Sequence, residues 1–369
     1  MNYPNFLKPN GRIGFIAPSF GCTIEPYLSD FQSALEEFKG MGYTTVPGPN
    51  CFADEGIGIS NTPEKCAAEV NDYFTNDKSD VIISCGGGEL MCEILPFVDF
   101  EKIASSTPKW FMGYSDNTNL TFLLNTLCDT ASIYSVCASK FAKDHHQCVD
   151  DAFDVLCGKK LSVSNYDKWF KDKYDSQDLP DDSEDGNGDG TKTSGPAPVD
   201  TYINEKTGDV YDVYEYKQYL YVGNRTVDSA SMSGRLIGGC MDCLVNLTGT
   251  RFDRMGDFND RYKDDGIIWF LEACDLGVMS IRRALWQMEN AGWFEHVRGF
   301  LIGRPLKFDD TFGDFDHYDA VLGILGKYNV PILMDLDIGH QFPQMPVISG
   351  ACANVEAAGN SFNMEFLLK

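Results

Sequence analysis

The sequence lacks a long apolar stretch, because none of its 369 residues belongs to a run of about eighteen or more apolar residues. A helix of roughly 20 apolar residues is needed to cross a bilayer, so no transmembrane helix is expected. The first residues, MNYPNFLKPNGR, have neither the basic start nor the apolar stretch of a signal peptide. We therefore expect a cytoplasmic protein that does not associate with membranes.

Basic residues are scarce as well. The chain has 30 Lys and Arg against 55 Asp and Glu, which gives a formal net charge of −25. A surface this acidic repels phosphate backbones and anionic lipids. The composition therefore excludes nucleic acid and anionic membranes as expected partners.

A disulfide or zinc framework is also missing, although the chain has thirteen cysteines. Their number is odd and they are scattered through apolar segments, which in a cytosolic chain is typical of reduced, buried thiols. One CxxC motif occurs, at Cys240 and Cys243, but the second pair that a zinc site would need does not follow. The flanking Gly238-Gly239 and Leu244-Val245 favour a helix start that packs into a core, with a redox dithiol as the alternative.

The length of the chain favours two domains. Residues 1–160 alternate continuous apolar strands with helical patterns, which indicates a parallel sheet with helices on both faces. We expect strands at Ile13–Ala17, Thr44–Val46, Asp80–Cys85, Trp110–Tyr114 and Ser132–Val136, and helices at Glu25–Met41, Pro63–Asn76 and Asn117–Cys128.

The composition changes near residue 160, and residues 161–222 are expected to be an irregular acidic insertion or linker. Residues 172–198 show no apolar periodicity. Part of this stretch imitates a calcium-binding loop, with Asp181, Ser183, Asp185, Gly186 and Asp189 at positions 1, 3, 5, 6 and 9. Position 12 is Lys192 instead of a bidentate Glu, so a surface loop is favoured.

Residues 223–369 are expected to form a second α/β lobe with a mixed or barrel-like sheet. The patterns indicate strands at Gly234–Gly238, Gly266–Glu272, Phe300–Gly303 and Pro331–Met334, helices at Met241–Leu247, Met279–Ala291 and Tyr318–Tyr328, and a β-hairpin over residues 347–366. The fold class is therefore α/β in both lobes.

One serine stands at a position suited to a nucleophile. In KWFMGYSDNTNL an apolar strand stops at Gly113, Ser115 occupies the turn, and helix-compatible residues follow. Such a turn presents a serine oxygen at the carboxyl end of a sheet, above a helix N-terminus that favours developing negative charge. The motif resembles a nucleophile elbow, although Asn117 replaces its second glycine. A serine that merely caps the helix is the alternative.

A serine nucleophile needs a base, and the base needs a group that orients it. Of the five histidines, His340 directly follows a strand and the segment DLDIG. It is the candidate base, and a histidine that caps a loop is the alternative. Glu272 ends the strand IIWFLE, where a buried carboxylate requires a partner, so it is the candidate orienting group. Asp275 is the competing choice.

The glycine run at residues 86–88 follows the strand DVIISC. Phosphate binding is disfavoured because no Lys-Ser/Thr follows and GxGxxG is absent. Glycine lets the backbone approach a substrate carbonyl closely. The amides of Gly87 and Asp116 are therefore the candidate oxyanion hole.

Seven stretches together resemble the LD-carboxypeptidase family of Ser-Glu-His peptidases, which includes the microcin self-immunity peptidases. They are GRIGFIAPS, SCGGGEL, MGYSDNTNL, GRLIGGC, WFLEACD, GWFEHVRGFLIGRP and DIGHQFPQMPV. The resemblance implies Ser115 as nucleophile, His340 as general base, Glu272 as its orienting group, and the Gly87 and Asp116 amides as oxyanion hole. It also implies a homodimer that uses neither a metal nor a cofactor.

The resemblance implies that the substrate is a small peptide or an aminoacyl-nucleotide. The first expectation is a carboxypeptidase that releases a terminal D-amino acid from murein tetrapeptide. The alternative is an amidase that cleaves aminoacyl-nucleotide antibiotics, and a non-catalytic ligand-binding protein is the rival from another class. Arg304 is a candidate for binding a substrate carboxylate, and Trp169 with Phe170 for stacking on a base. A structural arginine and local packing of the tryptophan are the alternatives.

Overall fold

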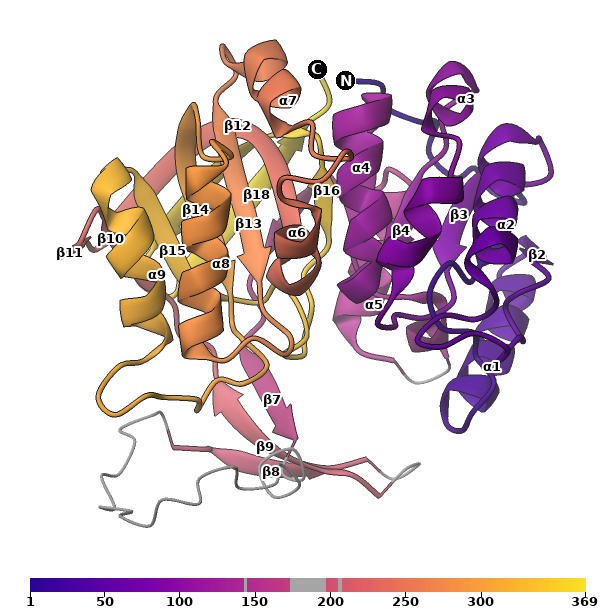
Figure 1. Cartoon of the computed structure of the whole chain (residues 1–369). Helices are drawn as coiled ribbons and strands as arrows, with labels where there is room; N and C mark the ends of the chain where they lie inside the picture. The colour runs from indigo at the N-terminus through magenta and orange to yellow at the C-terminus, as the bar shows by residue number, and fades with distance from the viewer. Residues whose placement is uncertain (143–144, 173–196, 205–207) are drawn as a thin grey trace.

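The computed structural model describes residues 1–142, 145–172, 197–204 and 208–369. They form two α/β lobes that lie side by side, with both chain termini near the boundary between the lobes (Figure 1). No helix within these ranges is long and apolar enough to cross a bilayer. The segment that imitates a calcium-binding loop, Asp181 to Lys192, lies outside the described residues.

The first lobe is built on a six-stranded sheet in the order β16-β5-β4-β3-β1-β2. Its strands are β1 (Arg12–Ile16), β2 (Thr44–Pro47), β3 (Val81–Ser84), β4 (Phe111–Gly113), β5 (Ser132–Tyr134) and β16 (Val347–Ser349). The pairings of β1 to β5 are all parallel, and only β16, which comes from the end of the chain, runs antiparallel to its neighbour. Every residue of β3 is buried, as a sheet covered on both faces requires. The predicted parallel sheet is confirmed.

The helices of this lobe are α1 (Tyr27–Gly40), α2 (Pro63–Thr75), α3 (Phe100–Ser105), α4 (Thr118–Cys128) and α5 (Gln147–Leu156). Short 3₁₀ helices occur at Met91–Phe97, Ser115–Asn117 and Ala138–Phe141. Helix α4 is buried on nearly all sides, because it contacts β4 and β5 of its own lobe and also strand β12 (Ser229–Cys240) of the other. In Figure 1 it stands at the boundary between the lobes, so it joins them into one body.

The second lobe contains a nine-stranded mixed sheet in the order β11-β10-β15-β14-β13-β12-β17-β18-β6. Its other strands are β6 (Ser162–Ser164), β10 (Tyr219–Val222), β11 (Arg225–Thr226), β13 (Ile267–Glu272), β14 (Val297–Gly303), β15 (Pro331–Leu336), β17 (Cys352–Ala358) and β18 (Ser361–Leu367). Strands β12 to β15 are parallel neighbours, and the others are antiparallel. The expected mixed sheet is confirmed. The hairpin expected over residues 347–366 is formed by β17 and β18 alone, because residues 347–349 belong to β16 of the first lobe's sheet.

Four α-helices and a 3₁₀ helix at Gly326–Tyr328 belong to this lobe: α6 (Met241–Leu247), α7 (Met255–Tyr262), α8 (Val278–Asn290) and α9 (His317–Leu325). Helices α8 and α9 pack against each other and cover one face of the sheet in Figure 1. Cys240 ends β12 and α6 begins at the next residue, so the CxxC motif spans a helix start, as expected.

The expectation of an irregular segment over residues 161–222 needs correction in its described parts. They contain β6 and β10 of the large sheet, and β7 (Lys168–Asp172), β8 (Asp200–Ile203) and β9 (Val210–Glu215) form a separate three-stranded sheet. This sheet lies below the second lobe in Figure 1. Trp169 pairs with Tyr214 across β7 and β9, and such aromatic cross-strand pairs stabilise a ribbon. The acidic average composition hides this local pattern.

The carboxyl ends of the parallel strands position the candidate residues. Gly87 follows β3 and Ser115 follows β4 in the first lobe, while Glu272 ends β13 and His340 follows β15 in the second. The arrowheads of β3 and β13 point to the same side of the molecule in Figure 1. Ligands of open α/β sheets bind at the carboxyl ends of the strands, so both lobes present the appropriate edge to one site.

Candidate active site

Ser115 has a backbone conformation that few residues other than glycine adopt. Its φ is 63°, in the left-handed region, at the turn between β4 and α4. This strain is the feature that lets a nucleophile elbow expose its side chain at the top of a sheet. The backbone therefore supports the special position that the sequence predicted for Ser115.

A continuous chain of hydrogen bonds links Ser115 to the other lobe. The Oγ of Ser115 lies 2.9 Å from Nε2 of His340, and Nδ1 of His340 lies 2.9 Å from Oε2 of Glu272. The three residues are brought together from positions that are 225 and 68 residues apart in the chain. This is the geometry in which an imidazole can accept a proton from a hydroxyl while a carboxylate holds its other nitrogen.

Electrostatics hold the Glu272 and His340 pair in a charged arrangement. The Glu272 side chain is fully buried, which alone would raise its pKa, but the neighbouring His340 and the hydrogen bonds from His340 and Tyr134 lower the pKa below its usual value. Burial lowers the pKa of His340, whereas the Glu272 carboxylate raises it, and the net result is a pKa well above the ordinary range. Glu272 is therefore an ionised partner that stabilises an imidazolium.

Gly87 lies directly against the nucleophile. A Cβ atom added at Gly87 would sit 3.3 Å from Cβ and 3.4 Å from Oγ of Ser115. Asp116 has a different environment, because its buried carboxylate accepts hydrogen bonds from the Ser19 hydroxyl at 2.5 Å, the Met91 amide at 2.9 Å and the Asn119 side chain at 3.0 Å. The side chain of Asp116 thus anchors the turn between β4 and α4.

Tyr134 belongs to the site, and the sequence did not single it out. Its hydroxyl donates a hydrogen bond of 2.5 Å to Oε1 of Glu272 and accepts one of 3.3 Å from the Ser115 amide. Burial and the Glu272 charge raise the pKa of Tyr134 well above its usual range, so the phenol keeps its proton and acts as a donor. A tyrosine in a short apolar strand is typical of the hydrophobic core. Only its position at the carboxyl end of β5, beside β4, could have indicated the contacts with Glu272 and Ser115.

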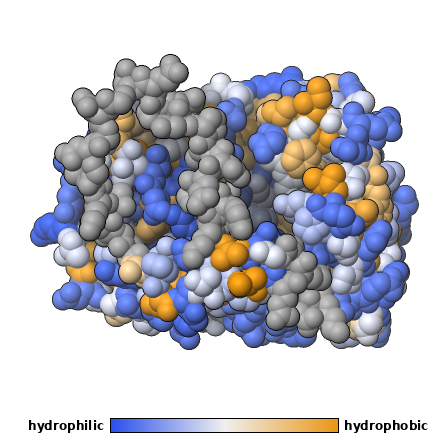
Figure 2. All heavy atoms as spheres, turned by 90° about the horizontal axis from the view of Figure 1, so that it is seen from below, coloured by the Kyte–Doolittle hydropathy of each residue, from blue (hydrophilic) through white to orange (hydrophobic). Residues whose placement is uncertain are grey.

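A pocket of about 560 Å³ opens beside His340. Aromatic side chains line much of it: Tyr114, Phe170, Tyr202, Tyr211 and Phe342. Lys140, His145 and His146 add polar groups to the wall. Figure 2, seen from the side of the strand ends, shows hydrophilic residues over much of this face with separate hydrophobic patches between them.

Arg304 and Trp169 are brought together, but away from this pocket wall. Arg304 is 1% exposed and its guanidinium bonds the Asp335 carbonyl at 2.9 Å and the Asp337 carboxylate at 3.2 Å. It also lies over the ring of Trp169, 4.4 Å from the centroid, while Tyr214 stacks on that ring at 4.2 Å. The Trp169 ring is therefore buried among protein groups, and neither Arg304 nor Trp169 lines the pocket beside His340.

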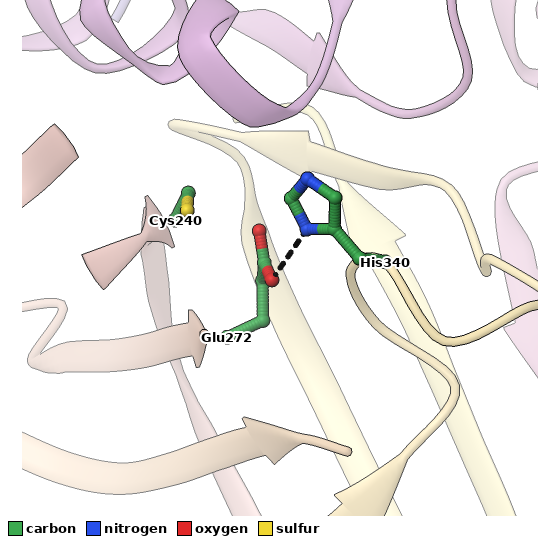
Figure 3. A group of neighbouring side chains, drawn as sticks. All are labelled: Cys240, Glu272 and His340. Carbon is green, nitrogen blue, oxygen red and sulfur yellow. Dashed lines mark hydrogen bonds and ion pairs between the residues drawn. The ribbon is translucent and has the colours of Figure 1, made fainter. Parts of the chain in front are cut away.

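Within the described residues, one group of side chains could hold a metal ion: Cys240, Glu272 and His340. Their ligand atoms all lie within 4.8 Å of one another. Figure 3 shows the Glu272 carboxylate between the Cys240 sulfur and the His340 ring. The second cysteine of the CxxC motif, Cys243, is hydrogen-bonded to the Cys240 thiol, and its own thiol also contacts the Ser115 carbonyl at 3.6 Å and an Asp116 oxygen at 3.9 Å.

Comparison with known proteins places both lobes in one family. Residues 13–135 match the model of the LD-carboxypeptidase N-terminal domain, and residues 233–355 match that of the LD-carboxypeptidase C-terminal domain. A Vibrio cholerae protein that bears a carboxypeptidase name is 23% identical over 99% of this chain and 98% of its own length. The Escherichia coli microcin C7 self-immunity protein MccF is 22% identical over 93% of this chain and 90% of its own.

Solved structures share the fold. An MccF-like protein from Bacillus anthracis superposes with a TM-score of 0.74 at 19% identity and covers 100% of both chains. A muramoyltetrapeptide carboxypeptidase from Oxalobacter formigenes gives a TM-score of 0.64 at 17% identity, covering 96% of this chain and 98% of its own. At these identities the likeness concerns the fold alone.

Proposed function

The chain belongs to the LD-carboxypeptidase family of peptidases, and from this premise we propose that it is a serine hydrolase that cleaves an amide bond by acyl transfer. One observation carries the proposal. Ser115, His340 and Glu272 form an unbroken chain of two 2.9 Å contacts across the boundary of the lobes. A hydroxyl, an imidazole and a buried carboxylate in this order are the groups that activate a serine nucleophile.

The proposed reaction begins when Ser115 Oγ attacks the carbonyl carbon of the scissile amide. Nε2 of His340 accepts the hydroxyl proton, and Glu272 stabilises the imidazolium through Nδ1. The tetrahedral intermediate collapses as His340 gives this proton to the leaving amine. Water, deprotonated by His340, then attacks the acyl-enzyme and releases the acid, and the returning proton restores Ser115.

The oxyanion of the intermediate is proposed to form beside Gly87 and the turn at Asp116. The absence of a side chain at Gly87 leaves room next to Ser115, where the added Cβ atom would stand 3.4 Å from Oγ. Backbone amides at this position and at the start of the following helix would donate to the oxyanion. Such donors are worth about 10²–10³ in kcat when one of them is removed.

For the substrate, we propose a murein tetrapeptide from which a terminal D-amino acid is released. A free carboxylate on the leaving group needs a cation, and Lys140 supplies a positive charge on the wall of the pocket beside His340. Lys140 therefore takes the place that the sequence suggested for Arg304, whose guanidinium is committed to Asp335 and Asp337.

A second candidate is the cleavage of aminoacyl-nucleotides, and the aromatic lining of the pocket favours it. Five aromatic side chains around one cavity offer faces on which a planar base can stack. Structures of MccF have been solved with glutamyl sulfamoyl guanosine and with aspartyl sulfamoyl adenosine. The pocket of this chain is large enough for such a leaving group, as small-molecule sites range from about 300 to 1,000 Å³.

The deciding experiment compares both substrates with purified protein. We expect the wild type to release D-alanine from murein tetrapeptide with a higher kcat/KM than it cleaves an aminoacyl sulfamoyl-adenosine, and the Ser115→Ala variant to cleave neither. The reverse order of kcat/KM selects the second candidate. Equal turnover by wild type and Ser115→Ala on both substrates would leave only a ligand-binding role. Light scattering on the same sample tests the proposed homodimer.

A further inference from the structure

The catalytic carboxylate and imidazole have a thiol as their neighbour. Cys240 is the last residue of β12 and stands directly opposite Glu272 in the register of the parallel strands β12 and β13. The sulfur of Cys240, a carboxylate oxygen of Glu272 and a ring nitrogen of His340 lie within 4.8 Å of one another. Cys240 and Glu272 are buried, and the His340 side chain is 12% exposed at the pocket.

Thiolate, imidazole and carboxylate are the three side-chain ligands that zinc uses in proteins. Nothing in the acyl-transfer reaction requires a thiol at Cys240, yet the fold places it beside two further zinc ligands (Figure 3). We propose that Cys240, Glu272 and His340 form an inhibitory binding site for Zn²⁺ or a similar thiophilic divalent ion. The ion binds the resting enzyme and switches off hydrolysis.

The required rearrangement is small. Bonds of about 2.0–2.3 Å in a tetrahedral site put neighbouring ligand atoms about 3.3–3.7 Å apart. Two of the atoms, Nδ1 of His340 and Oε2 of Glu272, are already 2.9 Å apart and need to separate slightly. The Cys240 sulfur must approach by about 1 Å at most to reach the zinc spacing. Rotation of the Cys240 side chain from its contact with Asp242, at 3.3 Å, supplies this movement.

The proton balance explains the inhibition. When Zn²⁺ enters, the thiol proton leaves to solvent and the thiolate binds the metal. The metal takes the place of the proton between Nδ1 and Oε2. In a neutral imidazole that proton moves to Nε2, and in an imidazolium it leaves to solvent while Nε2 keeps its own proton. Nε2 then carries hydrogen and cannot accept the proton of Ser115.

Cys243 offers the matched control for this assignment. It is also buried, and its thiol is hydrogen-bonded to that of Cys240, but it contacts the Ser115 carbonyl and Asp116 and makes no hydrogen bond to Glu272 or His340. A zinc ion held by the CxxC motif would need both cysteines. A zinc ion held by the proposed ligands needs Cys240 and not Cys243.

Calorimetric titration of the full-length protein with Zn²⁺ tests the binding. We expect one site whose affinity falls by more than about 10- to 100-fold in Cys240→Ser, because that is the loss seen when only an outer partner of a metal ligand is removed. Cys243→Ser should bind as the wild type does. Titration with Co²⁺ should give a thiolate-to-cobalt absorption band in the wild type and in Cys243→Ser, and none in Cys240→Ser.

Loss of binding in both cysteine variants overturns the proposal in favour of the CxxC motif, and unchanged binding in Cys240→Ser overturns it outright. If Cys240→Ser does not fold, His340→Ala, which changes a residue at the pocket, must lose the same affinity. The binding does not depend on turnover, whereas the inhibition rests on the proposed hydrolase activity. Zinc binding to a protein without activity would therefore contradict the proposed function and leave the site standing.

Discussion

The hydroxyl of Tyr134 is hydrogen-bonded to Oε1 of Glu272 at 2.5 Å, on the side of the carboxylate that His340 does not use. The same hydroxyl accepts a hydrogen bond of 3.3 Å from the backbone amide of Ser115. Tyr134 thus connects the strained turn of the first lobe to the buried carboxylate of the second. It is a positioning residue, because it acts on the proposed reaction only through Ser115 and Glu272.

Replacing Tyr134 by Phe should lower kcat by about 10- to 100-fold, since a hydrogen bond to a charged group contributes about 1.5–3 kcal/mol. KM should stay within a few-fold because no substrate contact is removed. Without this donor the pKa of Glu272 should rise. Glu272 then holds His340 less firmly, and the midpoint of the acid limb in the plot of kcat against pH should move. Steady-state kinetics over pH check this prediction.

Tyr73→Phe is the matched control, because the Tyr73 hydroxyl donates to the Val46 carbonyl far from Ser115. It should cost about 1 kcal/mol of unfolding free energy and leave kcat and its pH profile unchanged. Equal losses of kcat in the two variants would show that Tyr134 has only a structural role.

The fold of both lobes could be predicted from local sequence patterns. Buried parallel strands such as β3 are continuous apolar runs, and all of them except β15 are followed by a helical segment before the next strand. The three-stranded sheet was missed because its strands are separated along the chain by an acidic stretch, and the pairing of Trp169 with Tyr214 is a non-local contact.

The candidate site was predictable where each residue stands at a strand end, as with Ser115, Glu272 and His340. Tyr134 and Cys240 could not be recognised, because their closeness to Glu272 depends on which strands are neighbours. Arg304 also follows a strand, but its partner Asp337 comes from the next segment of the sheet and takes up its charge. Residues that stand at the ends of parallel strands are predicted to lie at the same edge of the sheet. Only the order of the strands in the sheet shows which of these residues are in contact.

The pH dependence of kcat/KM should report the raised pKa of His340. The neutral imidazole is the base, so activity is lost when the pH falls and His340 becomes protonated. Because Glu272 raises the pKa of His340, this acid limb should have its midpoint above the ordinary value of about 6.5. In Glu272→Gln the limb should shift to lower pH and kcat should fall by about 10³–10⁴-fold. A wild-type limb at or below pH 6.5, or one that Glu272→Gln leaves in place, would contradict the assignment.

A methyl group at residue 87 should impair the reaction without unfolding the protein. In Gly87→Ala the new atom stands 3.3 Å from Cβ and 3.4 Å from Oγ of Ser115, where it crowds the nucleophile and the proposed oxyanion position. We expect kcat to drop by about 10²-fold or more, as for loss of an oxyanion donor. In Gly86→Ala the added atom meets only the Phe20 carbonyl at 3.3 Å and should change kcat little. Kinetics and melting temperatures of the two variants settle the comparison, and similar kcat values in both would refute a role for Gly87.

The strain at Ser115 should be visible in stability once the hydroxyl is gone. Both Ser115→Ala and Ser115→Gly remove Oγ and should be inactive. A residue with a Cβ pays roughly 1–2 kcal/mol in the left-handed region, whereas glycine does not, so the glycine variant should be more stable by about 1 kcal/mol. At Ser33, in the middle of α1, the order of stability should reverse. Ser33→Gly should be less stable than Ser33→Ala by about 1 kcal/mol, because glycine is the poorer helix former. Denaturant unfolding of the four variants measures both differences. If alanine is the more stable replacement at residue 115 as well, the turn is not strained, and the nucleophile elbow loses its structural support.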